Sequence, residues 1–430
     1  MKTTGKLTHW VKGRLSSLKQ DVANLFQLPN YLIIFTCWSI NSIALGLPEG
    51  NFQFFVVALG GTAASLGIID FWKYMIMAIV AIPGGFLADR HGRRWLIVSG
   101  TFIMAISYVF NFLATHWYFI LLGTIVNSFS LIYQPALIAL LQDSLGSKNR
   151  GTGTAMMNVA FSLTFIGSIF ANMILPCFGE VFGMRIIYGL MIILFLITAM
   201  LRVFKIQETI ENKQRFRFRE FIYVFPKAFK EMFAVRRFIS RTVLWITITR
   251  TLVFVATWVT VLINAIYAKN ILQLTEEQWW LLFIPSNLTL FIVSYPVGKI
   301  VDRIGRKIPL FVGLIIFTGA TVIFMNGDYL LVIVSMCLRN LGQIMVFSSI
   351  LSLTTDYVEQ EYRGKINGFN NTLAYIATGL GSYMGGQLYE GNPQFPFQIS
   401  IGATILATVI TLLFVHNKKT KEVDQDVENP

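Results

Sequence analysis

Five ionisable side chains fall inside long apolar stretches of the sequence: Glu49, Asp70, Lys73, Arg250 and Arg339. A charged residue at the centre of a membrane helix costs about 2.5–3.5 kcal/mol on insertion scales. Residues that costly usually face a polar cavity or a partner. These five are therefore the first candidates for binding or proton chemistry.

The two arginines lie deep in their apolar stretches. Arg250 follows Arg241 by nine residues, and Arg339 follows Asp328 by eleven, so each lies roughly 13–16 Å into a helix, near mid-membrane. An arginine keeps its charge and can form two parallel hydrogen bonds to a carboxylate or phosphate. Both arginines could bind an anionic solute. Each could instead have a structural role and bind helix carbonyl oxygens or a neighbouring acid.

Polar side chains recur at helical spacings near these arginines and in two other apolar stretches. Arg250 shares a helix face with Asn264, and Arg339 shares one with Gln343. The polar residues that we expect to complete a substrate or ion site are Asn127, Gln134, Asn264, Asn340 and Gln343.

The acidic residues predict two different roles. Glu49 is the candidate proton carrier, because a carboxyl group buried in a membrane can take up a proton near neutral pH. It lies in a Pro48-Glu-Gly-Asn51 run, which should loosen the helix and free backbone groups for a ligand. Asp70 and Lys73 are three residues apart and can pair, so we expect a structural intramembrane pair.

The elements that must position these residues are apolar helices. Of the 430 residues, 55% are hydrophobic and 13% are charged, about half the charged share of a soluble domain. Most of the apolar runs reach the roughly 20 residues that span a bilayer. The runs lie near 31–58, 65–88, 95–114, 117–141, 153–176, 184–204, 241–267, 278–301, 308–325, 329–354, 366–388 and 396–415.

The positive charges predict the orientation of the twelve spans. If both termini are cytoplasmic, 30 of the 35 Lys and Arg residues fall in the tails and inner loops, and only Arg185 and Lys269 fall in outer loops. This asymmetry follows the positive-inside rule. It also explains the net charge of +13 without nucleic acid.

The central linker needs a separate interpretation. Arg215, Arg217 and Arg219 alternate with phenylalanines, which could suggest single-strand nucleic-acid binding. An interfacial helix on anionic lipid explains the same pattern, and we favour it. No apolar signal sequence is visible over residues 1–29, and the three cysteines lack the spacing of a disulfide framework or zinc site.

The chain repeats itself with an offset of 213 residues. Asn127 falls on Asn340, and Pro83 falls on Pro296, without a gap. The offset also superposes the segment from Gly85 to Arg94 on the segment from Gly298 to Lys307. Two parallel six-helix repeats imply a pseudo-two-fold axis along the membrane normal, with a site between the halves.

These two segments resemble the loop motif of the major facilitator superfamily. Gly85-Phe-Leu-Ala-Asp-Arg-His-Gly-Arg-Arg94 and Gly298-Lys-Ile-Val-Asp-Arg-Ile-Gly-Arg-Lys307 match G-x-x-x-D-R-x-G-R-R/K between helices 2 and 3, and again between helices 8 and 9. The resemblance covers the whole chain. It implies an all-α membrane protein of twelve transmembrane helices in two pseudo-symmetric six-helix bundles.

The resemblance also implies a conformational gate. The two aspartates of the motif would lie near the inner ends of helices 11 and 5, and its arginines would contact acids or lipid phosphates when the inner side is closed. The expected gate residues are Gly85, Asp89, Arg90, Gly92, Arg93, Arg94, Asp143, Arg150, Gly298, Asp302, Arg303, Gly305, Arg306, Lys307, Asp356 and Arg363. The alternative is that these charges only set topology and form a solvated face.

Other family signatures are missing. The helix 4 arginine of many members is replaced by Thr124, and the following glutamine by Asn127. The Gly-Pro signature of proton-driven drug antiporters is absent from helix 5, where Gly167 precedes a serine. The resemblance therefore indicates the superfamily and leaves the substrate open.

We expect five segments: a cytoplasmic N-terminal segment (1–30), a first bundle (31–204), a cytoplasmic linker (205–240), a second bundle (241–415) and a cytoplasmic tail (416–430). The predicted function is secondary transport of a small organic solute by alternating access, with proton coupling. A solute sensor on a transporter fold and a lipid flippase are the alternatives. We expect no enzyme activity, cofactor, metal or nucleic-acid partner. We expect membrane lipids as partners, and a monomer in the plasma membrane.

Overall fold

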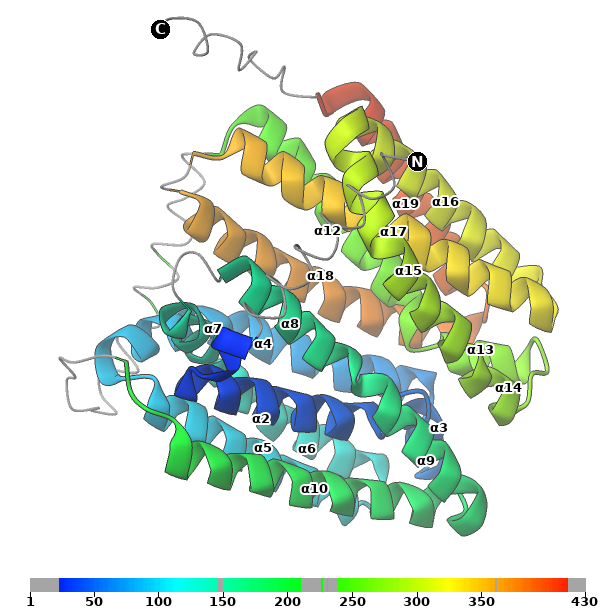
Figure 1. Cartoon of the computed structure of the whole chain (residues 1–430). Helices are drawn as coiled ribbons and strands as arrows, with labels where there is room; N and C mark the ends of the chain where they lie inside the picture. Colours follow the sequence, from blue (N-terminus) through cyan, green and yellow to red (C-terminus); the bar gives the residue numbers. More distant parts are fainter. Residues whose placement is uncertain are drawn as a thin grey trace, which may run out of the picture. The chain divides into compact units, whose positions relative to one another are not determined.

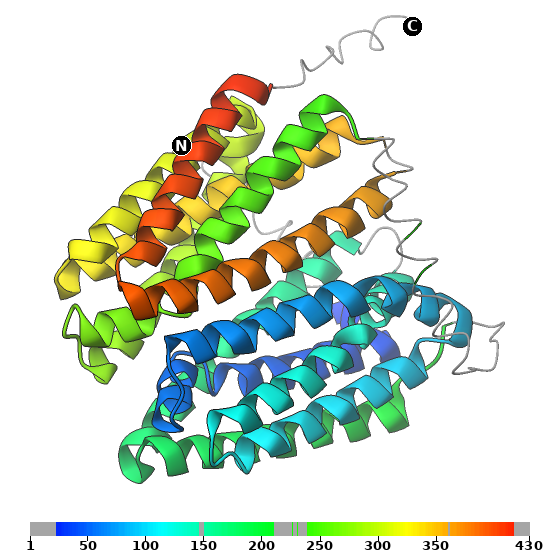
Figure 2. The same cartoon turned by 180° about the vertical axis from the view of Figure 1, so that it is seen from behind.

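The computed structural model describes residues 23–145, 150–209, 239–359 and 362–416, with Pro226 and Lys230 between them. Its elements are helices throughout (Figures 1 and 2), as the apolar runs predict. They group into two compact units. Unit 1 comprises Met1–Gly61 and Ile79–Ala228, and unit 2 comprises Thr62–Ala78 and Phe229–Pro430. The first half of helix α4 (Ala63–His91) therefore belongs to unit 2.

Unit 1 holds the second half of α4 and the helices of the first repeat. They are α2 (Pro29–Gly46), α3 (Phe52–Ala58), α5 (Arg94–Phe112), α6 (Trp117–Ser130), the 3-10 turn η1 (Leu131–Tyr133), α7 (Gln134–Ser144), α8 (Arg150–Ser162), α9 (Thr164–Phe178) and α10 (Glu180–Lys205). Helix α5 packs mainly against α10 and α6, and α2 packs against α10 and α9.

Unit 2 holds the first half of α4 and the helices of the second repeat. They are α12 (Arg241–Val261), α13 (Asn264–Asn270), α14 (Glu276–Leu281), α15 (Phe283–Ile304), α16 (Lys307–Asn326), α17 (Tyr329–Tyr357), α18 (Arg363–Gly391) and α19 (Phe395–Phe414). Helix α12 packs against α18 and α19, and α16 packs against α17.

Every predicted apolar run is helical. Among the described residues, nine helical stretches are long and apolar enough to cross a membrane. The other three predicted runs are occupied by α2 with α3, by α14 with α15, and by α18. The expected all-α membrane fold is confirmed. The run 31–58 is interrupted at residues 47–51, where α2 ends and α3 begins, in agreement with the loosening expected from the Pro48-Glu-Gly-Asn51 run.

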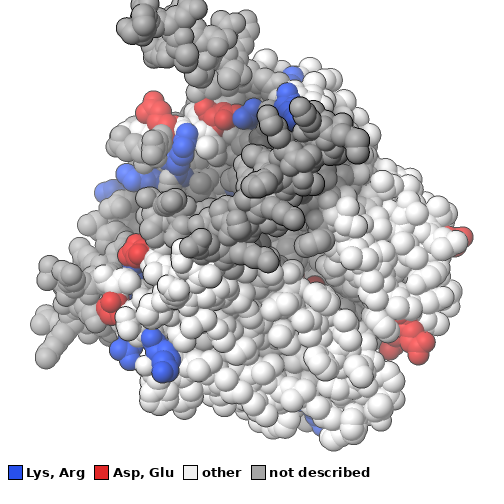
Figure 3. Space-filling model, viewed as in Figure 1, with Lys and Arg blue, Asp and Glu red and all other residues white. Residues whose placement is uncertain are grey.

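The outer surface suits a lipid environment. Large apolar side chains are exposed on many helices, such as Phe204 at 76% and Leu330 at 68%. On the face seen in Figure 3, most of the described residues are uncharged, and the charged residues are few. Such an apolar surface is stable in lipid and would aggregate in water.

Helices inside each unit approach closely at glycines. In unit 1, a Cβ on Gly46 would lie 1.8 Å from the Thr164 carbonyl oxygen of α9. In unit 2, a Cβ on Gly385 of α18 would lie 2.0 Å from the Val259 carbonyl oxygen of α12. Small residues allow membrane helices to pack backbone against backbone. The second contact holds α18 against α12, the helix that carries Arg250.

Candidate functional site

Arg339 lies on α17 in unit 2 and reaches α12. Its Nη2 donates to the Thr257 carbonyl oxygen at 3.2 Å and to the Thr260 hydroxyl at 2.9 Å. The guanidinium also lies 5.2 Å from the centroid of the Phe317 ring. When the Asn264 amide is turned to face it, the amide oxygen accepts from Nη1 at 3.0 Å. All of these partners are neutral.

Arg250 lies on α12 and contacts α18. Its Nη2 donates to Asn371 Oδ1 at 2.9 Å, and its guanidinium lies 5.5 Å from the Phe254 ring centroid. Residues 250 and 254 are one turn apart, so they share a face of α12. Across the described residues, neither Arg250 nor Arg339 forms an ion pair with a carboxylate.

The remaining polar candidates of unit 2 lie on α17 and at the start of α13. Asn340 Nδ2 donates to the carbonyl oxygen and hydroxyl of Ser286 on α15, at 2.9 and 2.6 Å. Gln343 is partly buried on α17, one turn beyond Arg339. Asn264 begins α13 and is 9% exposed. Unit 2 thus brings five of the predicted site residues onto two helices and the start of a third.

The candidates of unit 1 are more scattered. Asn127 on α6 donates to Ser107 Oγ on α5 at 3.0 Å, so it ties two helices together. Gln134 begins α7 and is exposed. Glu49 lies in the turn between α2 and α3, beyond the end of α2 at Gly46, and its side chain is exposed. Its role as a proton carrier stays a prediction.

Asp70 and Lys73 lie on the part of α4 that belongs to unit 2. Lys73 Nζ is 3.7 Å from Asp70 Oδ1. Asp70 is 4% exposed, and its Oδ2 lies 3.5 Å from the Ser382 hydroxyl of α18. The spacing of the two charges anticipates their proximity, whereas the α18 partner could not be read from the sequence.

The two motif loops form equivalent ion pairs, each inside its own unit. In unit 1, Arg93 pairs with Asp143 at the end of α7. In unit 2, Arg306 Nε is 3.0 Å from Asp356 Oδ2 at the end of α17. The arginine and the aspartate of the second pair each lie 213 residues after those of the first pair. Each pair therefore connects a motif loop to the end of another helix of the same unit, α7 in unit 1 and α17 in unit 2.

Glycine is needed at the turn of each motif loop. Gly92 has φ 94° and Gly305 has φ 93°, which a side chain would strain. The next helix begins directly after each turn, and its first basic side chain binds a carbonyl oxygen. Arg94 Nη2 donates to Val203 at 2.6 Å, and Lys307 Nζ donates to Leu412 at 2.8 Å.

The other predicted gate residues are only partly described. Arg363 donates to the Val358 and Thr355 carbonyl oxygens at 3.2 and 3.1 Å. Arg303 is exposed and Gly298 is partly buried. The side-chain surroundings of Gly85, Asp89, Arg90, Arg150 and Asp302 lie outside the described residues. Their gate role stays a prediction.

Sequence reasoning missed one buried cation. Arg202 of α10 is 1% exposed, donates to Thr101 Oγ1 and lies 5.5 Å from the Tyr133 ring centroid. It falls inside the predicted run 184–204, which was the signal that could have identified it. It links α10 to α5 and η1, within the core of unit 1.

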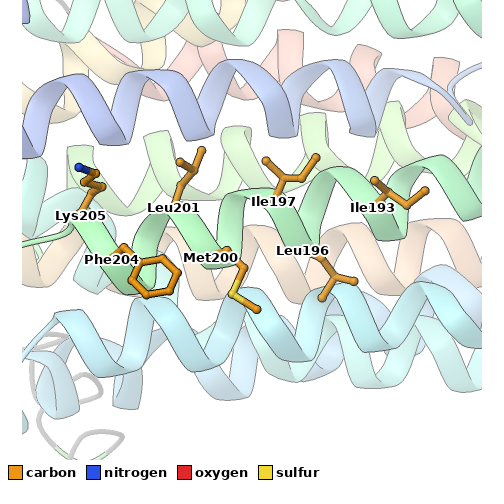
Figure 4. Close-up of a pocket in the computed structure, with 7 residues that line it drawn as sticks. All are labelled: Ile193, Leu196, Ile197, Met200, Leu201, Phe204 and Lys205. Atoms are coloured by element: carbon orange, nitrogen blue, oxygen red, sulfur yellow. The ribbon is translucent and has the colours of Figure 1, made fainter.

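An apolar groove on α10 is distinct from the polar candidates. It has a volume of 590 Å³ and is lined by Ile193, Leu196, Ile197, Met200, Leu201, Phe204 and Lys205 (Figure 4). Apart from Lys205 at one end, these side chains offer no hydrogen-bonding or charged group for a solute. The groove is part of the lipid-facing surface.

Comparison with known proteins supports the architecture. The family model described as Major Facilitator Superfamily matches residues 28–382 and 251–429. An uncharacterized MFS-type transporter of Methanocaldococcus jannaschii is 21% identical over 371 residues, covering 84% of this chain and 91% of the relative. Multidrug resistance protein 2 of Bacillus subtilis is 21% identical over 358 residues, covering 80% of this chain and 85% of the relative.

A solved structure shows the same fold. The nucleoside transporter NupG has a TM-score of 0.67 and 15% sequence identity, and the match covers 90% of this chain and 100% of that one. The family match spans nearly the whole chain. The two copies of the loop motif lie between α4 and α5 and between α15 and α16. The chain therefore belongs to the major facilitator superfamily and is a membrane transporter, not an enzyme.

Proposed function

We propose that this transporter carries a small organic solute with an anionic group, by alternating access and with proton coupling. The solute binds to the guanidinium groups of unit 2. Within unit 1, Asn127 and Gln134 are the polar candidates, and Glu49 carries the proton. The two motif loops act as the gate.

The observation that carries this proposal is the charge of Arg339 among neutral partners. Its hydrogen bonds go to a carbonyl oxygen and a hydroxyl group, with the Asn264 amide beside them. Burying a charge without a counter-ion is expensive, and membrane proteins accept that cost mainly where the charge is used. A carboxylate or phosphate on the solute would supply the missing counter-charge by a bidentate contact.

Arg250 of α12 supports the same conclusion. Asn371 accepts one hydrogen bond from it and contributes no charge. Neighbouring aromatic and polar side chains suit a solute with an apolar body. Two guanidiniums in one unit favour an anionic group over a neutral or purely cationic solute.

The test begins with binding. Purified protein is screened against metabolites and drugs by thermal shift, and hits are tested for uptake into proteoliposomes with and without a pH gradient. Arg339→Ala should abolish the stabilisation and uptake of anionic hits. Arg241→Ala, which removes an exposed guanidinium from the start of α12, is the matched control and should retain both. Unchanged transport in Arg339→Ala would remove Arg339 from the site.

The uptake arm separates transport from the two alternatives. A sensor would bind the solute without moving it into vesicles, and a flippase would lose solute binding in competition with phospholipid. Spin labels on the two motif loops provide the test of alternating access. Their separation should change when the solute is added, and one fixed separation under all conditions would contradict the proposed gate.

A further inference from the structure

A buried carboxylate in unit 2 lacks close donors among the described residues. Asp70 Oδ1 lies 3.7 Å from Lys73 Nζ, and Oδ2 lies 3.5 Å from Ser382 Oγ. Charge-assisted hydrogen bonds are normally near 2.7–2.9 Å. The Ser382 hydroxyl is shared, because it lies equally far from the Trp258 carbonyl oxygen of α12. Asp70 is thus positioned to accept a stronger donor than the ones it has.

Aromatic rings from three helices pack together around Tyr74, which lies one turn after Asp70 on α4. Tyr74 of α4 lies 5.2 Å from Trp258 of α12, edge to face, and 6.4 Å from Tyr375 of α18, stacked, between ring centroids. Aromatic faces attract ammonium groups within about 6 Å, and more strongly where water is excluded. A carboxylate next to such rings is the chemistry that recognises an organic ammonium ion.

The Lys73 side chain already brings one ammonium group to this place. Its Nζ is 4.9 Å from the Tyr74 ring centroid as well as 3.7 Å from Asp70. The Lys73 side chain is 39% exposed, whereas that of Asp70 is 5% exposed. Lys73 thus reaches the buried carboxylate from its more exposed side, through a long and flexible side chain that a ligand ammonium could replace.

We infer that Asp70, Tyr74, Trp258 and Tyr375 form a subsite for a protonated amine of the solute, which Lys73 occupies with its own ammonium until the solute displaces it. The subsite accounts for the loose contacts of Asp70 and for the position of Lys73 between a carboxylate and a ring. It gives the Asp70–Lys73 pair a binding role in place of the structural one expected from the sequence.

The subsite lies along the helix faces that carry Arg250. On α12, Arg250, Phe254 and Trp258 follow one another at four-residue intervals and share a face. On α18, Asn371, which binds Arg250, is one turn before Tyr375. Residues 250 and 258 are roughly 12 Å apart along the helix. This inference rests on the proposed function, since it names the second charge of the same solute and makes it a zwitterion.

The test uses three probes of equal chain length: hexanoate, hexylammonium and 6-aminohexanoate. Their binding to the full chain in detergent is measured by thermal shift and calorimetry. Lys73→Met removes the internal ammonium and keeps an apolar stem. It should bind hexylammonium and 6-aminohexanoate about tenfold more tightly than the unaltered protein, with hexanoate unchanged. Adding Asp70→Asn to Lys73→Met should remove that gain.

Lys269→Met is the matched control. Lys269 is an exposed lysine that pairs with Glu276, and its loss should leave amine binding unchanged. Equal or weaker amine binding by Lys73→Met, or a gain that survives Asp70→Asn, would overturn the subsite. Hexanoate binding that resists Arg250→Ala and Arg339→Ala would instead defeat the proposed anionic site, while the amine result would stand on its own.

Discussion

Unit 1 and unit 2 place different residues at equivalent positions of their cores. In unit 1, Arg202 donates to Thr101 and lies over the Tyr133 ring. The residues 213 positions later are Leu314, Val346 and Val415, and they belong to one apolar cluster in unit 2. A buried guanidinium needs partners, whereas an apolar cluster needs only close packing. The repeat thus preserves helix positions without preserving the chemistry of the interior.

The candidate site shows the opposite asymmetry. Arg250 and Arg339 of unit 2 correspond to Cys37 and Val126 of unit 1, and Glu49 of unit 1 corresponds to Leu262 of unit 2. The motif loops, in contrast, keep the same ion pair and the same glycine conformation in both units. The repeated ion pairs and glycine turns therefore build the frame of both units, whereas Arg250 and Arg339 have no charged counterpart in unit 1 and are the first residues to test for solute binding.

The largest expected effect is on the stability of unit 1. Arg202→Ala removes a fully buried side chain and its bond to Thr101, and should cost about 3 kcal/mol in unfolding free energy. The equivalent Val415→Ala in unit 2 should cost less, about 2 kcal/mol, because a smaller volume is lost. Thermal unfolding in detergent measures both. A smaller effect for Arg202→Ala than for Val415→Ala would show that the guanidinium is not a structural element of the core.

The next effect sharpens the assignment of the site to unit 2. Arg250→Met keeps the length of the side chain and removes its charge. Affinity for an anionic solute should fall about thirtyfold, or roughly 2 kcal/mol, because the contact to a charged group is lost. Calorimetry with a hit from the solute screen measures this loss, and Arg241→Met is the control on the same helix. Unaltered affinity in Arg250→Met would exclude this arginine from the site.

A smaller difference separates the two motif pairs. The Arg93 side chain is 10% exposed and also donates to Thr209 Oγ1, whereas the Arg306 side chain is 32% exposed. Double-mutant cycles with alanine should give a coupling of about 1 kcal/mol for Arg93–Asp143 and about 0.5 kcal/mol for Arg306–Asp356. Thermal unfolding provides the readout. Equal couplings would mean that burial does not distinguish the pairs.

The smallest expected effect on solute binding is that of a substitution at Glu49. Glu49→Gln preserves the shape of the side chain and prevents proton release. Uptake into proteoliposomes should then lose its dependence on the pH gradient while solute binding stays within about twofold. Asp328→Asn, at the start of α17, serves as the control for loss of an acidic charge. A pH dependence that persists in Glu49→Gln would rule it out as the carrier.

Much of the architecture could be read from the sequence. Apolar length predicted each spanning helix, and the offset of 213 residues related Arg93 to Arg306 and Asp143 to Asp356 before their contacts were known. The same offset aligned Gly92 with Gly305, and the structure gives both glycines a positive φ. These features depend on local chemistry: the cost of polar groups in lipid, and the conformational freedom of glycine.

Only the tertiary structure decided which side chains meet. No pattern in the sequence assigned Thr101 and Tyr133 to Arg202, or Ser382 and Trp258 to the surroundings of Asp70, since these residues come from distant helices. The Pro48-Glu-Gly-Asn51 run predicted a loosened helix, but only the structure showed that α2 ends at Gly46, before Glu49. The physical reason is that periodicity determines the face of a helix on which a residue lies, while packing between helices determines what that face contacts.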